Sequence, residues 1–107
     1  MGRTRVDLQD LLEGITPTVY FQPPSDQQMT YPCIVYQRYQ SDTKFANNSP
    51  YRNTKRYQVT VISRDPDDVI PGKVANLPMC LFNRFFAVNS LNHDVYDLYF
   101  EEERVND

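Results

Sequence analysis

The hydrophobic and polar positions alternate most regularly in Lys55–Ser63, which is typical of a half-buried β-strand. A second segment rich in β-branched and aromatic residues, Cys33–Gln40, precedes it, and a polar connection over 41–54 separates the two. Two such segments predict a long β-hairpin, and the length of its connection places the tip beyond the core of a small domain. The apolar positions of the second strand are Tyr57, Val59 and Val61.

A helical period marks the N-terminal segment. Thr4 is placed to cap a helix, and Asp7 follows three residues later as the acidic partner of a capping box. Gly14 is predicted to end the helix as a left-handed residue, and Pro17 prevents its continuation. The apolar stripe that would face a core consists of Leu8, Leu11, Leu12 and Ile15.

Four further elements follow from shorter patterns. Thr18–Gln22 is predicted to be a short strand, and a second helix is expected from about Pro71 to Leu77. Two more strands, Cys80–Val88 and Val95–Glu101, are separated by 89–94, a segment dense in turn-forming residues that is predicted to be a turn.

The resulting order, α-β-β-β-α-β-β, predicts an α+β fold with a largely antiparallel sheet, two helices packed on one face and a long protruding hairpin. The 107 residues, 40% of them hydrophobic, suit a single domain spanning 1–107 with a modest core. The last six residues, 102–107, are expected to form a frayed, flexible tail.

Charge and composition exclude several classes of protein. The net charge of −3 and the pI near 5.0 argue against nucleic acid as the main partner. No apolar run approaches membrane-spanning length, and the first residues lack the apolar core of a secretory signal, so we expect no membrane partner and a cytoplasmic origin. The two cysteines, Cys33 and Cys80, lack CxxC spacing and are predicted to be reduced and buried.

Catalytic and metal sites find little support in the sequence, which predicts no enzyme and no cofactor. The single histidine, His93, lies in the predicted turn before Asp94, and we interpret it as a turn residue bonded to nearby backbone. A small hydrolase built on His93 with a cysteine or serine nucleophile is the enzymatic alternative. The acidic cluster over 65–68 lacks the glycine and distal glutamate of a calcium loop, and no glycine-rich phosphate loop is present.

The charges are distributed asymmetrically along the chain. Five basic residues and one acidic residue lie between Arg38 and Arg56, whereas five acidic residues and one basic residue lie between Asp97 and Asp107. These segments are either two solvated surfaces or complementary surfaces of neighbouring subunits, and a head-to-tail contact of the second kind closes into a ring when the rotation between subunits allows it.

Aromatic residues in the hairpin connection lie too far out to join the core and favour a protein interface there. The alternative is a nucleic-acid-binding module that uses the basic, aromatic hairpin. The predicted interface residues are Arg38, Lys44, Phe45, Asn47, Asn48, Tyr51, Arg52, Lys55, Arg56, Glu101, Glu102 and Glu103.

Four runs of sequence resemble one known family. They are YFQPPSDQQMTYPCIVY (20–36), TKFANNSPYRNTKRYQVTVISRDPD (43–67), IPGKVANLPMC (70–80) and LNHDVYDLYF (91–100). In this order they resemble the tail terminator, tail completion or minor capsid proteins of long-tailed bacteriophages. The resemblance extends over most of the chain, from about residue 20 to residue 100.

The resemblance implies a structural virion protein without catalytic residues or cofactors. Tail terminators form a hexameric ring at the head-proximal end of the tail tube, where they stop polymerisation of the tube protein and present a surface to the head connector. Genome DNA passes through the lumen without specific binding. The expected location is therefore the neck of the virion, after assembly in the host cytoplasm. Other neck proteins, the stopper and the adaptor, are the alternatives, although adaptors are typically more helical.

Overall fold

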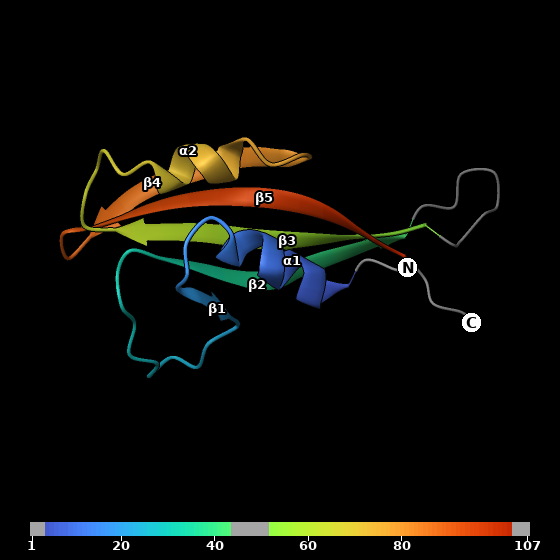
Figure 1. Ribbon diagram of the computed structural model, residues 1–107, viewed down its shortest axis with the longest axis horizontal. Helices are drawn as coiled ribbons and strands as arrows, with labels where there is room; N and C mark the ends of the chain where they lie inside the picture. The colour runs from blue at the N-terminus through green and yellow to red at the C-terminus, as the bar shows by residue number, and fades with distance from the viewer. Residues whose placement is uncertain (1–3, 44–51, 104–107) are drawn as a thin grey trace.

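The computed structural model describes residues 4–43 and 52–103 as an α+β domain with a five-stranded, mostly antiparallel sheet and two helices (Figure 1). The strand order is β1-β2-β3-β5-β4, which makes β1 and β4 the two edges of the sheet. The predicted α+β class with a largely antiparallel sheet is therefore confirmed, whereas the protruding hairpin stays a prediction. In chain order the elements are α1 (Arg5–Glu13), β1 (Val19–Phe21), β2 (Cys33–Thr43), β3 (Arg52–Ser63), α2 (Ile70–Ala75), β4 (Cys80–Val88) and β5 (Leu91–Glu103).

Helix α1 begins as its capping box predicts, because the Thr4 amide donates to the Asp7 carboxylate at 2.7 Å. Its end differs from the prediction: Gly14 has φ −70°, which is right-handed. The amide of Ile15 donates to the Leu12 carbonyl at 2.9 Å. This tightened last turn pairs a carbonyl at the end of the helix without a left-handed glycine cap. The apolar stripe is also narrower than predicted, since Leu11 is 40% exposed.

The sheet joins one parallel pair to three antiparallel pairs. The short strand β1 lies parallel to β2, with Val19 opposite Ile34, and the pairs β2–β3, β3–β5 and β4–β5 are antiparallel. Strands β2 and β3 correspond to the two predicted hairpin arms and are longer than predicted, by three residues each toward the connection. The segment 44–51, which would be the hairpin tip, lies outside the described residues.

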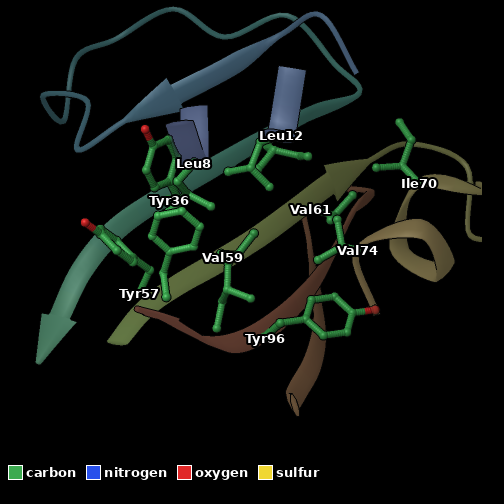
Figure 2. Close-up of a cluster of buried hydrophobic side chains, with 12 residues drawn as sticks. Leu8, Leu12, Tyr36, Tyr57, Val59, Val61, Ile70, Val74 and Tyr96 are labelled. Carbon is green, nitrogen blue, oxygen red and sulfur yellow. The ribbon is translucent and has the colours of Figure 1, made fainter. Parts of the chain in front are cut away.

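A single hydrophobic core lies between the helices and one face of the sheet (Figure 2). In Figure 2, Leu8 and Leu12 of α1 point toward Tyr36 of β2, and Val74 of α2 points toward the strands. Both helices therefore contact the same face, which is called the helix face below; the opposite face carries no described helix and is called the open face. The buried strand residues of the core are Ile34, Tyr36, Tyr57, Val59, Val61, Tyr96, Leu98 and Phe100.

Strands β4 and β5 meet in a two-residue turn instead of the predicted six-residue turn. Asn89 and Ser90 both have positive φ, 54° and 65°, which is the backbone of a type I′ hairpin. Strand β5 thus starts at Leu91, and His93 lies in the strand, so its predicted place in a turn is wrong. At the other end β5 runs through Glu103, two residues into the segment that was expected to be frayed, and 104–107 lie outside the described residues.

The acidic turn before α2 is held by its own side chains. The Asp68 carboxylate accepts the Ile70 amide at 2.9 Å and the Ser63 hydroxyl at 2.8 Å. Asp65 accepts the Asp67 amide at 2.9 Å. The bond to Ile70 satisfies a free amide at the start of α2, as expected for negative charge near a helix N-terminus, and the other two bonds hold the turn before it. The helix itself ends at Ala75, two residues earlier than predicted.

Candidate functional site

Strand β4 is the most unusual surface of the described chain, because it is an edge strand with large apolar side chains in solvent. All of its residues except Cys80 are exposed. Edge strands in soluble proteins usually carry charges or are covered, since an uncovered apolar edge promotes association. The exposed apolar side chains, each between 37% and 61% accessible, are Leu81, Phe82, Phe85, Phe86 and Val88.

A β-bulge divides these side chains between the two faces of the sheet. The regular register with β5 shifts between Phe82 and Arg84, which leaves Asn83 as the extra residue. On the helix face, the Phe82 ring meets the Tyr96 ring edge-on at 5.6 Å. Phe85 lies on the same face, because it pairs with Asp94, two positions along β5 from Tyr96.

The open face of β4 carries the remaining apolar side chains. Phe86 stacks on the His93 ring with a centroid distance of 4.4 Å and an angle of 13°. Leu81 pairs with Asp97, which also accepts hydrogen bonds from the Asn83 amide at 3.2 and 3.3 Å. The bulge is therefore tied to β5, and aromatic groups remain exposed on both sides of it.

A small apolar groove lies on the helix face, between α1 and the segment that leads into β4. Its volume is about 90 Å³, and Leu98 and Phe100 line it from β5. Leu11 and Met79 also line it and are 40% and 61% exposed. Met79 has a left-handed backbone, φ 58°, and its carbonyl accepts the Tyr99 amide at 3.0 Å. A bulky residue in this conformation is uncommon and points to a constraint on its position.

The predicted charged interface residues are brought together within one chain. The backbone register places Arg52 opposite Glu103, Asn53 opposite Glu102 and Thr54 opposite Glu101. Opposite charges at paired positions of neighbouring strands stabilise a sheet. One oppositely charged pair, Arg52 and Glu103, therefore occupies paired backbone positions within the subunit, and a contact between subunits at the predicted residues stays a prediction.

The other predicted interface residues separate between the two faces. Arg38 and Lys55 line a shallow depression of about 470 Å³ on the helix face, together with Arg5. Arg56 lies on the open face, where its guanidinium sits 4.4 Å from the Tyr39 ring centroid and donates to the Tyr99 hydroxyl at 3.1 Å. This hydrogen bond raises the pKa of Arg56 above its usual value.

The predicted tip residues fall in the segment that the structure does not describe. They are Lys44, Phe45, Asn47, Asn48 and Tyr51.

The residues considered for catalysis do not form a nucleophile and base. Cys33 and His93 are both register partners of Ile62, so they flank it at about 10 Å from each other, two strand spacings apart. Burial raises the pKa of Cys33 to about 11, whereas a nucleophilic cysteine needs a lowered pKa. His93 and Asp94 are adjacent in β5 and point to opposite faces, and the His93 Nδ1 lies 3.2 Å from the Leu91 carbonyl oxygen.

Within residues 4–43 and 52–103, no three potential metal ligands of the His, Cys, Asp or Glu type cluster. In the same part of the chain no helix has the length and hydropathy needed to span a bilayer. Neither cysteine forms a disulfide in this structure. Cys33 is buried and Cys80 is half-buried, so the predicted burial holds fully for Cys33 alone.

No family model matches the chain, and no curated protein is significantly similar to it. The feature that sequence reasoning missed is the exposure of β4. A signal for it was present, since Cys80–Val88 is nearly continuous in apolar residues, which is typical of a strand buried on both faces. In the single chain it is buried on neither.

Proposed function

We propose that the protein is a structural subunit of a long-tailed phage neck, a tail terminator that caps the head-proximal end of the tail tube as a ring. The observation that carries this proposal is the uncovered apolar strand β4. The sequence resemblance over 20–100 supplies the type of assembly. A protein whose work is to join copies of itself and neighbouring proteins needs such surfaces and needs no catalytic residues.

The size of the exposed surface supports an assembly role. A fully exposed aromatic side chain presents roughly 150–250 Å². On that scale the exposed parts of the five β4 side chains amount to on the order of 500 Å². The largest apolar patch of a typical monomer is about 300–600 Å² and is often functional, and a stable interface buries about 800 Å² per partner. Because these side chains lie on both faces of β4, each face would supply a part of one such interface.

The alternative of a nucleic-acid-binding hairpin has less support. The backbone register places Arg52 of β3 opposite Glu103 of β5, and the five acidic residues of β5 outnumber the three basic residues of β3, so the two strands together carry no excess of positive charge. A surface that binds phosphate through counterion release needs an excess of positive charge. Specific DNA binding is therefore no part of the proposed function.

Phage genetics tests the proposal. Deletion of the gene should give tail tubes of irregular, excessive length that are not joined to heads, and the intact gene supplied in trans should restore normal tails. Tails of normal length joined to heads in the deletion would overturn it. A neck reconstruction then separates the three neck proteins: a terminator ring contacts the tail tube directly, whereas a stopper or adaptor ring lies on the head side.

A further inference from the structure

The chain carries both an apolar projection and an apolar groove on its helix face. The projection consists of Phe82 and Phe85, which are 59% and 52% exposed on β4. The groove lies beside the first residue of the same strand and is rimmed by Leu11 and Met79. Apolar surfaces of this kind are typical of the centre of a protein interface, where an aromatic anchor enters a pocket.

One chain cannot fill its own groove with its own projection. Phe85 lies six residues after Met79 along an extended strand, which corresponds to about 20 Å at 3.3 Å per residue. The strand is fixed by its pairing with β5, so Phe85 cannot reach back to the groove, and the ring of Phe82, three residues after Met79, is held against the Tyr96 ring. The groove of one molecule is therefore available to the projection of another.

A symmetric pairing of two β4 strands is disfavoured by their only charge. Arg84 is the middle residue of Cys80–Val88, so two full-length antiparallel copies would place Arg84 directly opposite itself. Like charges at paired positions destabilise a sheet. The bulge at Asn83 further interrupts a continuous ladder of backbone hydrogen bonds between two copies. The contact should therefore be made by side chains and not by extension of the sheet.

We infer that neighbouring copies meet head to tail, with the β4 aromatic side chains of one copy covering the groove rimmed by Leu11 and Met79 of the next. The occupant of both surfaces is thus a second copy of this chain. The exposed rings of Phe82 and Phe85 would form the centre of this contact, and a contact between two different surfaces of identical subunits closes into a ring when the rotation between subunits allows it. The inference rests on the proposed ring subunit and names the residues through which it assembles.

Two complementary variants of the full chain test this contact. Phe85→Asp removes the projection and keeps the groove, whereas Leu11→Asp removes the groove and keeps the projection. The matched controls are Val6→Asp, which is on α1 and 56% exposed but points away from the groove, and Val69→Asp, which is 66% exposed before α2. Far-ultraviolet circular dichroism and thermal melting establish that each variant is folded. If either aspartate variant does not fold, Phe85→Ala and Leu11→Ala take their places.

Sedimentation velocity gives the result. The wild type and both controls should form an oligomer larger than a dimer. Each test variant alone should be monomeric, because the loss of a central interface residue should raise the dissociation constant about 30-fold or more. An equimolar mixture of the two test variants should form a one-to-one heterodimer that does not extend, because one intact contact remains. A monomeric or dimeric wild type, a test variant that assembles normally, or a mixture that stays monomeric would overturn the inference.

The two proposals fail in different ways. If rings form through this contact while the gene deletion leaves normal tails joined to heads, the proposed function is wrong and the assembly contact stands. If the deletion gives overlong, headless tails while Leu11→Asp and Phe85→Asp assemble normally, the function stands and the contact lies elsewhere.

Discussion

Leu11 and Leu12 are neighbours in α1 with opposite environments, and they provide a sharp test of the fold. Leu12 is fully buried in the cluster that joins α1 to the sheet, whereas Leu11 is 40% exposed at the groove. Leu12→Ala removes three buried carbon atoms and leaves a cavity, because the sheet beneath the helix cannot follow the missing side chain. Leu11→Ala removes the same atoms from a partly solvated site.

The expected loss for Leu12→Ala is about 3 kcal/mol of unfolding free energy, within the range of about 2–5 kcal/mol measured for buried leucines. A domain of this size has about 5–15 kcal/mol in total, so the variant should still fold. At about 4–8 °C per kcal/mol, its melting temperature should fall by roughly 12–24 °C. Leu11→Ala should lose about 1–1.5 kcal/mol, because 40% of the Leu11 surface stays in water in the single chain and the substitution leaves no closed cavity.

Urea unfolding followed by circular dichroism measures both values. It should be done at a concentration where the wild type is monomeric, since association would add its own stabilisation. Equal losses for the two variants would refute the placement of α1, and so would a loss below about 1 kcal/mol for Leu12→Ala. The assembly assay should give the reverse order, with Leu11→Ala weakening association and Leu12→Ala acting only through stability.

Two further predictions concern titrating groups. Burial raises the pKa of both Cys33 and Cys80 to about 11, whereas thiols of the unfolded chain have a pKa of about 8.5. At pH 8 the native protein should therefore react with Ellman's reagent more than about 100-fold more slowly than the unfolded chain. Immediate reaction of both native thiols would contradict the burial. Burial also raises the pKa of Asp94, so the folded state holds this proton more tightly than the unfolded chain does, and stability falls as the pH rises from about 3.9 through the folded pKa. Asp94→Asn should therefore raise the melting temperature at pH 7 and do so less at pH 3, whereas the same change at both pH values would show that the carboxylate is not the cause.

The elements with a strong period were predictable from the sequence. The alternation of Tyr57, Val59 and Val61 identifies the strand and the face that it buries, and the capping box at Thr4 identifies the start of α1. Leu11 was misplaced because a helical stripe has edges, and a residue at the edge is buried only if a neighbouring element reaches it. In this chain the segment after α2 stops short of Leu11 and leaves the groove.

The error at His93 has a local physical cause. Segment 89–94 is rich in turn-forming residues, but only Asn89 and Ser90 adopt left-handed backbone, which is sufficient for a two-residue hairpin. Asn92 serves the sheet instead, because it pairs with Ser63 and its side-chain amide donates to the Ser63 carbonyl at 3.1 Å. Composition predicts that a turn is present but not where the strand resumes.

The sequence shows which segments carry opposite charges, but it does not show which of these residues lie opposite one another in the sheet. Opposite charges in Arg52 and Glu103 are separated by half the chain, and only the strand order β2-β3-β5 places them side by side. Because strand order depends on which pairs of strands bury most apolar surface together, it is a property of the whole domain. A reversal of Glu103 to lysine would consequently place like charges at paired positions of β3 and β5, in addition to any effect on a contact between subunits.

Strand β4 shows the converse case: the sequence pattern predicts the strand correctly, but the single chain does not bury it as the pattern predicts. A nearly continuous apolar run such as Cys80–Val88 is found in strands covered on both faces. Here the strand forms in the predicted range but lies at an edge, where most of its side chains meet solvent.

Natural sequences are locally consistent with their folded environment except at functional sites, so an apolar strand left in water indicates that its environment is completed by another molecule. Arg84 and the bulge at Asn83 limit what that molecule can do, because they oppose a second strand in register and leave the flanking aromatic side chains accessible. A partner that presents a pocket to these side chains satisfies both constraints, and the groove at Leu11 and Met79 is such a pocket on the chain itself.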